Sequence, residues 1–128
     1  MITVIVADDH TVLRDGLRYL LEAQGDIQIV GMAANGLEAV EQARLYCPDV
    51  VVMDISMPIM NGIEATKLIC QSCRDTKVVV LSMHHTAEYM QRALEAGAAG
   101  YLLKDSAGKE LVTAIRNLKH GQVYISQK

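Results

Sequence analysis

The sequence predicts an α/β fold, a three-layer sandwich in which a parallel β-sheet lies between two layers of helices. Short runs rich in β-branched residues alternate with longer amphipathic segments along all 128 residues, and this alternation is typical of parallel strands joined by helical crossovers. Some of the short runs are apolar at every position, as expected of central strands that are buried on both faces. These runs are Val4–Ala7, Val50–Met53 and Val78–Leu81.

Five strands are predicted from these and similar runs. They are Thr3–Ala7, Ile27–Met32, Val50–Met53, Lys77–Leu81 and Gly100–Leu103. Right-handed crossovers between them place helices on both faces of the sheet. A flavodoxin-like strand order of 2-1-3-4-5 is one of two common solutions for such a chain, and the pattern of runs does not choose between them.

The first two helices are predicted from apolar residues spaced near 3.6. The first helix carries an apolar stripe made of Val12, Leu13, Leu17, Leu20 and Leu21. The second covers Gly36–Tyr46, and it ends before Pro48 because the residue that precedes a proline avoids the helical region. Its predicted inner face consists of Leu37, Val40, Ala43 and Leu45.

Three more helices complete the five that the fold requires. They are predicted over Gly62–Cys73, Thr86–Ala96 and Ser106–His120. Gly97 and Gly121 follow the last two helices, at positions where a helix C-terminus favours a left-handed residue. Between the fourth strand and its helix, His84 and His85 are interpreted as a solvated loop pair.

Composition indicates one domain, residues 1–128, with an aliphatic core. Hydrophobic residues make up 51% of the chain, but Trp and Phe are absent. The net charge is -3, and the scattered Lys and Arg residues disfavour direct binding of nucleic acid. The first residues lack a signal-peptide pattern, and no apolar run approaches a membrane span, so we expect a soluble cytoplasmic protein. The chain has three cysteines, Cys47, Cys70 and Cys73. Because this number is small and odd, we expect reduced thiols that serve in packing and form no disulfide.

Polar residues follow the predicted strands at their carboxyl ends. Asp8 and Asp9 follow the first strand, Asp54 the third, Ser82 the fourth and Lys104 the fifth. Because these ends meet at one edge of a parallel sheet, the side chains are expected to converge there. A lone Asp at such a place is more often a helix cap, and a lone Lys is more often a surface charge. A functional site is favoured because such polar residues follow four different strands at the same edge of the sheet.

Clustered carboxylates repel one another unless a cation lies among them, and oxygen ligands favour Mg²⁺. Without the ion, at least one carboxyl group is expected to have a raised pKa. A metal ion and a lysine together neutralise a transferring phosphoryl group, which an aspartate can accept as nucleophile. Asp54 is the preferred acceptor, since Asp8 or Asp9 would put the acceptor on the outer side of the acidic pair.

Four segments resemble the motifs of response regulator receiver domains, the switch modules of two-component signal transduction. They are Val6–His10, Val52–Gly62, Leu81–Ser82 and Gly100–Asp105. The resemblance spans essentially the whole chain in the same order and spacing. His10, Gly62–Ala65 and Tyr101–Asp105 are most similar to the LuxR-type (NarL/FixJ) subfamily. Of the two common strand orders, the flavodoxin-like order 2-1-3-4-5 is the one we expect.

The resemblance implies roles for the residues of the cluster. Asp54 would take a phosphoryl group from a sensor histidine kinase or phosphotransfer protein. Asp9 and Asp54 would bind Mg²⁺, or Mn²⁺ in its place, directly, Asp8 would bind it mainly through water, and the Ser56 backbone carbonyl would complete the set. Lys104 would pair with a phosphoryl oxygen.

The resemblance also implies a switch made of Ser82 and Tyr101. The Ser82 hydroxyl would move to hydrogen-bond the phosphoryl group, and the Tyr101 ring would then turn inward. A static surface tyrosine is an equally good interpretation of Tyr101 from the sequence. Pro58 and Gly62 would shape the loop that follows the acceptor, with Gly62 relieving steric strain.

The implied function is signalling rather than enzymatic turnover, with self-phosphorylation from small phosphodonors and autodephosphorylation. LuxR-type regulators usually continue into a helix-turn-helix effector that binds DNA and controls transcription. The end of the chain, Gln122–Lys128, resembles the start of such a linker. We therefore expect that the effector domain was removed, and that the receiver is able to form a homodimer when phosphorylated.

Three other functions compete with this interpretation. A flavodoxin-type electron carrier is disfavoured because Asp8 and Asp9 would repel the phosphate of a flavin. A phosphatase with an aspartyl-phosphate intermediate would place its nucleophile after the first strand and a second acid two residues on, whereas Ser56 stands there. A stand-alone or phosphorylation-independent receiver that acts as a protein-binding module remains the main alternative.

Overall fold

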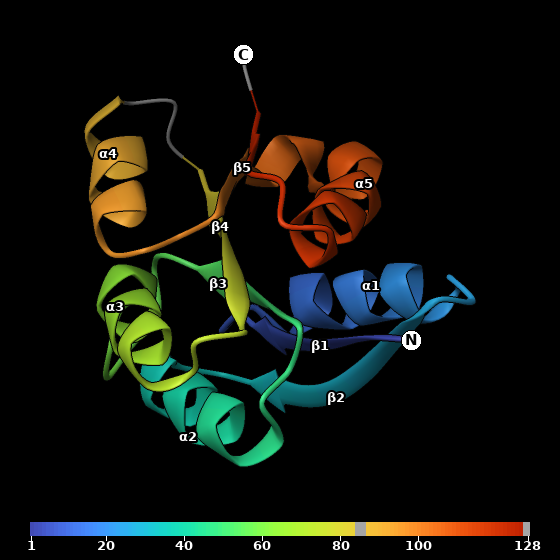
Figure 1. Ribbon diagram of the computed structural model, residues 1–128, viewed down its shortest axis with the longest axis horizontal. Helices are drawn as coiled ribbons and strands as arrows, with labels where there is room; N and C mark the ends of the chain where they lie inside the picture. Colours follow the sequence, from blue (N-terminus) through green and yellow to red (C-terminus); the bar gives the residue numbers. More distant parts are fainter. Residues whose placement is uncertain (84–86, 127–128) are drawn as a thin grey trace.

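A parallel β-sheet forms the middle layer of the protein, and helices cover both of its faces (Figure 1). The computed structural model describes residues 1–83 and 87–126. The strands are β1 (Ile2–Ala7), β2 (Ile27–Ala33), β3 (Val50–Asp54), β4 (Lys77–Ser82), β5 (Gly100–Leu103) and β6 (Tyr124–Ile125). Their order in the sheet is β2-β1-β3-β4-β5-β6, so the predicted order 2-1-3-4-5 is confirmed and one short strand is added.

The helices divide between the two faces of the sheet (Figure 1). They are α1 (Thr11–Glu22), α2 (Gly36–Tyr46), α3 (Gly62–Ser72), α4 (Ala87–Glu95) and α5 (Ala107–Lys119), with a 3₁₀ turn, η1 (Lys104–Ser106), before α5. The helices α1 and α5 pack on one face, and α2, α3 and α4 pack on the other. The predicted start of the fourth helix at Thr86, and the pair His84 and His85, lie outside the described residues.

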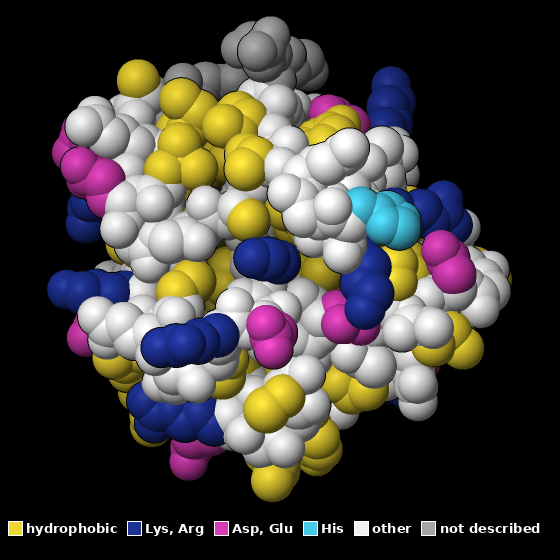
Figure 2. Space-filling view, viewed as in Figure 1, with side chains coloured by type: hydrophobic (Ala, Val, Ile, Leu, Met, Phe, Trp, Pro, Cys, Tyr) yellow, Lys and Arg dark blue, Asp and Glu magenta, His cyan; other side chains and the backbone are white. Residues whose placement is uncertain are grey.

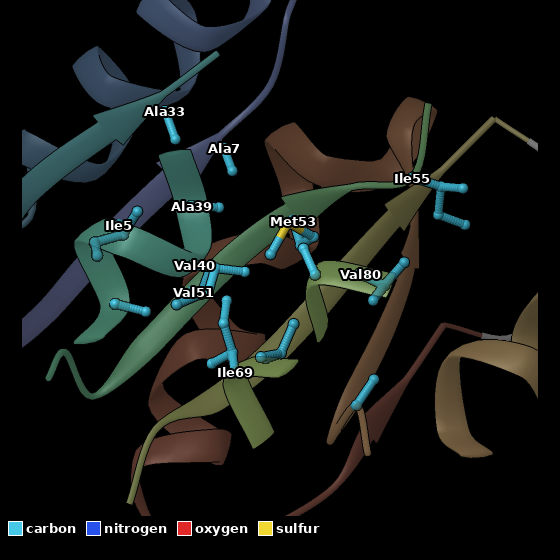
Figure 3. Close-up of a cluster of buried hydrophobic side chains, with 14 of the residues drawn as sticks. Ile5, Ala7, Ala33, Ala39, Val40, Val51, Met53, Ile55, Ile69 and Val80 are labelled. Carbon is cyan, nitrogen blue, oxygen red and sulfur yellow. The ribbon is translucent and has the colours of Figure 1, made fainter. Parts of the chain in front are cut away.

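Alternate residues of the central strands supply the two halves of the core. Ile5, Val51 and Met53 face α2 and α3, where they meet Val40 and Ile69 (Figure 3). Their neighbours Val4, Val6 and Val52 face the side of α1 and α5. The fully apolar runs therefore mark strands that are buried on both faces, as predicted.

The predicted inner faces of the first two helices were partly wrong. Of the apolar stripe predicted for α1, only Leu17 and Leu21 are buried. Val12 lies at the start of the helix and is 88% exposed. In α2 the buried residues are Gly36, Ala39, Val40 and Ala43, which follow the helical period from the first residue onward. Leu37 and Leu45 lie off this stripe and are 44% and 72% exposed.

A sixth strand, β6, follows α5, and the sequence did not predict it. In β6, Tyr124 and Ile125 pair in parallel with Gly100 and Tyr101 of β5. The Tyr124 hydroxyl donates to the Glu110 carboxylate of α5 at 2.7 Å. A segment that resembled the start of a linker is therefore bound to the edge of the sheet as far as Ser126.

Turns and caps fix where the helices begin and end. Gly97 and Gly121 have φ angles of 110° and 83°, which confirms the left-handed positions predicted for them. The side chain of Asn61 accepts a hydrogen bond from the Glu64 N–H at 2.9 Å and caps the N-terminus of α3. Among the described residues, no helix is both long and apolar enough to cross a lipid bilayer.

Gly62 starts α3 in direct contact with the end of β3. Its N–H donates to the Ile55 carbonyl at 2.8 Å. A Cβ atom at this position would lie far closer than 3.0 Å to the Asp54 carbonyl oxygen. The absence of a side chain therefore lets α3 begin against the backbone of Asp54, in agreement with the role expected of Gly62.

We predict that Gly62→Ala lowers the free energy of unfolding by about 2–3 kcal/mol, because the added methyl group must displace backbone. Urea denaturation followed by circular dichroism measures this change. Gly16→Ala is the matched control, since Gly16 lies inside α1 with nothing within 4 Å of an added Cβ. That variant should gain up to about 1 kcal/mol. Equal stability of the two variants would contradict the assigned close approach.

Candidate functional site

The carboxyl ends of four strands meet at one edge of the sheet, and the predicted polar residues lie there. Asp54 is the last residue of β3 and pairs with Leu81, while Ser82 is the last residue of β4 and pairs with Leu103. Lys104 follows Leu103 directly, and Asp8 follows β1. The predicted convergence of these residues at the sheet edge is thus confirmed.

A buried ion-pair cluster forms the centre of this edge. The Lys104 ammonium lies 3.0 Å from Asp54 Oδ1 and 3.5 Å from Asp8 Oδ2. The side chains of Asp8, Asp54 and Lys104 are 1%, 2% and 7% exposed. Two carboxylates therefore share one ammonium group in a position where water contributes little.

Burial raises the pKa of Asp54 from its ordinary value of 3.8 to about 6. The hydrogen bond and the charge of Lys104 lower the pKa, whereas the nearby charge of Asp8 raises it further. A hydrogen bond from the backbone of Ser56 also lowers it, by a smaller amount. The raised pKa expected for at least one clustered carboxyl group is therefore found at Asp54.

Two carboxylate oxygens of the cluster lack hydrogen-bond partners. Asp8 Oδ2 and Asp54 Oδ2 are both buried, and neither accepts a hydrogen bond from the part of the chain that the structure describes. A buried acceptor without a partner is costly, and such groups commonly mark the position of an ion or ordered water. The donor chemistry therefore fits a small divalent cation bound by oxygen.

His10 belongs to the same cluster, although the sequence analysis did not assign it a role there. Oxygen or nitrogen atoms of Asp8, Asp9, His10 and Asp54 all lie within 4.8 Å of one another. The His10 ring nitrogen Nδ1 is 3.2 Å from Asp8 Oδ1 and 3.3 Å from Asp9 Oδ1. Its place directly after Asp8 and Asp9 was the available sequence signal.

The loop between β3 and α3 is tightly turned next to Asp54. The Met57 N–H donates to the Ile55 carbonyl at 3.1 Å, and the Met60 N–H donates to the Pro58 carbonyl at 2.7 Å. Ile59 has a φ angle of 71°, which is unfavourable for a β-branched residue, and it is 77% exposed. Ser56 lies within this loop, two residues after Asp54, so the shape of the loop sets where its backbone points.

Tyr101 is buried in the core, with only 3% of its surface exposed. It belongs to the cluster of apolar side chains on the α3 and α4 side, which includes Ala93 and Ala98. The alternative interpretation of Tyr101 as a surface residue was therefore wrong. The signal that could have indicated burial is its position inside a four-residue strand, Gly100–Leu103, that is buried throughout.

Charges on the surface are mixed rather than segregated. On the face shown in Figure 2, Lys and Arg side chains are interspersed with Asp and Glu, and they do not gather into one basic patch.

Comparison with known proteins identifies the family. Residues 4–116 match the family described as the response regulator receiver domain. The response regulator UvrY of Escherichia coli (strain K12) is 44% identical over 126 residues, which cover 98% of this chain and 58% of that protein. The chain thus spans less than two thirds of the length of this curated relative.

Solved structures agree with this assignment. The two-component response regulator of the LuxR family from Aurantimonas sp. SI85-9A1 has a TM-score of 0.92 and 37% identity, and the match covers 97% of this chain and 89% of that chain. The receiver domain of a NarL response regulator from Mycobacterium tuberculosis has a TM-score of 0.90 and 35% identity, with coverage of 94% and 98%. The chain therefore belongs to the response regulator receiver domain family, as a LuxR-type member.

Proposed function

We propose that this chain is a phosphorylation switch in which Asp54 accepts a phosphoryl group from a sensor histidine kinase or a phosphotransfer protein. The observation that supports this proposal most strongly is that the two oxygens of the Asp54 carboxylate have different surroundings. The Lys104 ammonium lies 3.0 Å from Asp54 Oδ1, while Asp54 Oδ2 is buried and accepts no hydrogen bond from the described residues. The group is thus oriented by a cation and keeps an oxygen for a new interaction.

The unpartnered oxygens of Asp8 and Asp54 support Mg²⁺ as the cofactor, with Mn²⁺ as a substitute. In this proposal Asp9, Asp54 and the Ser56 carbonyl bind the ion directly, and Asp8 binds it through water. When bound, the ion neutralises charge on the oxygens of the phosphoryl group.

The chain's own residues account for the rest of the transfer. Because the pKa of Asp54 is about 6, the carboxylate is mostly ionised at neutral pH and is able to attack phosphorus. A P–O bond to Asp54 forms as the P–N bond to the donor histidine breaks, and the imidazole that leaves takes up a proton. Lys104, already 3.0 Å from Asp54, stays paired with the charge that accumulates there.

The product carries a charge signal into the sheet. Phosphorylation replaces one negative charge with about two at a buried position. Ser82 lies at the end of the neighbouring strand β4 and is 1% exposed, which supports the proposal that its hydroxyl moves to hydrogen-bond the phosphoryl group. We propose that the movement of the Ser82 side chain toward the phosphoryl group is transmitted to Tyr101 on β5, whose side chain is already buried. Hydrolysis of the aspartyl phosphate by water restores the original state.

The whole protein would then use this domain to control transcription. The LuxR-type relatives suggest a separate DNA-binding domain. The chain covers 58% of UvrY, and such a domain would lie in the part of that relative's length that the match does not cover. We propose a cytoplasmic location, in keeping with the free thiols of Cys47, Cys70 and Cys73. Homodimerisation on phosphorylation belongs to the same proposal, and the domain acts as a switch rather than as a turnover enzyme.

We predict that acetyl phosphate with Mg²⁺ adds one phosphoryl group to the chain, and that Asp54→Asn accepts none. The amide is a poor nucleophile and cannot form the acyl phosphate. Intact-mass spectrometry counts the groups added. Asp75→Asn is the matched control, because Asp75 is an exposed residue that precedes β4 at the opposite edge of the sheet. Equal labelling of the Asp54 variant and this control would refute Asp54 as the acceptor.

A second prediction concerns pH and metal. Between pH values of about 4 and 6, the folded protein holds a proton on Asp54 that the unfolded chain has lost. In EDTA the free energy of unfolding should therefore fall as the pH rises through this window, by roughly 1–3 kcal/mol. Urea titrations at a series of pH values measure this fall.

Asp54→Asn removes the titrating group, so its stability should not show this fall between the same pH values. At neutral pH, Mg²⁺ should raise the stability of the natural chain and have much less effect on the variant. An identical pH profile for the two proteins in EDTA would contradict the assigned pKa of Asp54.

A further inference from the structure

We infer that His10 is a ligand of the metal ion at this site. Its nitrogen would make the site bind first-row transition metals such as Mn²⁺ and Co²⁺ more tightly than Mg²⁺, and this difference in affinity would be larger than the carboxylates alone would give. The inference rests on the metal site of the proposed function and adds a nitrogen donor to it. Asp9 and Asp54 are the oxygen ligands already proposed.

The distances around His10 match those between adjacent ligands of one ion. In an octahedral site with ligands at about 2.1 Å, neighbouring ligand atoms lie about 3.0 Å apart and opposite ones about 4.2 Å apart. Nδ1 of His10 lies 3.3 Å from Asp9 Oδ1, the direct ligand of the proposed site, and 3.2 Å from Asp8 Oδ1, whose carboxylate would bind the ion through water. The full set with Asp54 lies within 4.8 Å, so a contraction of a few tenths of an ångström at each ligand would gather the set around one ion.

The backbone holds the imidazole in this place. His10 is the N-cap residue of α1, but its side chain makes no capping hydrogen bond. Its N–H donates to Asp8 Oδ1 at 2.8 Å, and its carbonyl accepts from the Arg14 N–H at 2.9 Å. The ring is thus directed toward the carboxylates by the turn that starts the helix, and not by any role in capping.

Two buried oxygens give independent support for an ion at this position. Asp8 Oδ2 and Asp54 Oδ2 are buried and accept no hydrogen bond from residues 1–83 and 87–126, and their side chains are 1% and 2% exposed. The printed contacts of the imidazole are with Asp8 Oδ1 and Asp9 Oδ1, so they leave Asp54 Oδ2 without a hydrogen bond and Asp8 Oδ2 with only the Lys104 ammonium at 3.5 Å. A cation bound by Asp9, Asp54 and the ring would supply the partner that hydrogen bonds within the cluster do not give to the Asp54 carboxylate.

The donor set determines which ion is favoured. Mg²⁺ prefers oxygen ligands and retains water, whereas imidazole nitrogen suits transition metals, whose affinity rises along the series from Mn²⁺ to Cu²⁺. The His10 ring is 64% exposed, so it is able to turn toward or away from an ion without disturbing the core. The chain would therefore bind Mg²⁺ through oxygen and bind Mn²⁺ or Co²⁺ through oxygen and nitrogen.

The test is direct detection of nitrogen bound to the metal. Electron spin echo envelope modulation of the Mn²⁺ complex of the natural chain should show coupling to an imidazole ¹⁴N nucleus. The coupling should vanish in His10→Ala and persist in His120→Ala. His120 is the matched control because it is an exposed histidine at the C-terminal end of α5.

Affinity gives a second measurement. In calorimetric titrations of the unphosphorylated chain, His10→Ala should weaken Co²⁺ binding roughly tenfold or more and should change Mg²⁺ binding by less than about twofold. His120→Ala should change neither value. Circular dichroism confirms that each variant is folded.

The outcomes separate this inference from the proposed function. If Mn²⁺ binds at the Asp54 site but shows no ¹⁴N coupling, or if His10→Ala weakens Co²⁺ and Mg²⁺ equally, His10 is not a ligand and the oxygen site remains. If neither Mn²⁺ nor Mg²⁺ binds to the natural chain, both the inference and the metal-dependent function are refuted. Loss of coupling in His10→Ala alone supports the inference.

Discussion

The buried pair of Asp54 and Lys104 is the constraint on which the rest of the molecule depends. Burying one charge without a partner is costly, and a buried pair repays that cost only with good geometry. Here the two groups come from the ends of different strands and meet at 3.0 Å. The observed register, in which Asp54 pairs with Leu81 and Ser82 with Leu103, brings the ends of β3, β4 and β5 to the same level and so brings the two groups together.

The cluster is also incompletely satisfied, and this links stability to function. One lysine pairs with two buried carboxylates, and within the described part of the chain an oxygen of each accepts no hydrogen bond. A protein optimised for stability alone would not retain such a group. The excess of negative charge is what allows a cation to bind there. Burial is the main cause of the raised pKa of Asp54, and the charge of Asp8 raises it further.

The sequence was most informative about features that depend on the type and order of residues. Fully apolar runs identified Val4–Ala7, Val50–Met53 and Val78–Leu81 as buried strands, and the polar residues that follow them predicted the site. Such inferences hold because parallel strands place their carboxyl ends at one edge, whatever the details of packing. The Asp54 and Lys104 contact is a direct result of this rule.

Features that depend on side-chain direction or on tertiary contacts were not predicted. Val12 and Leu45 are apolar but lie off the buried stripes, since small shifts in the rotation of a helix decide which apolar residues face the sheet. The orientation of His10 depends on the turn before α1, and the burial of Tyr101 depends on packing with α4 residues. The two-residue strand β6 is too short to show a sequence periodicity.

The strand β6 has a consequence for solubility. The outer edge of a sheet exposes backbone groups that can recruit strands from other molecules, and natural proteins protect such edges. Here the Tyr124 and Ser126 N–H groups donate to the carbonyl oxygens of Ala99 and Tyr101 at 3.1 and 2.9 Å. The tail thereby shields one side of the sheet from edge-to-edge aggregation, and among the described strands it leaves β2 as the other outer edge.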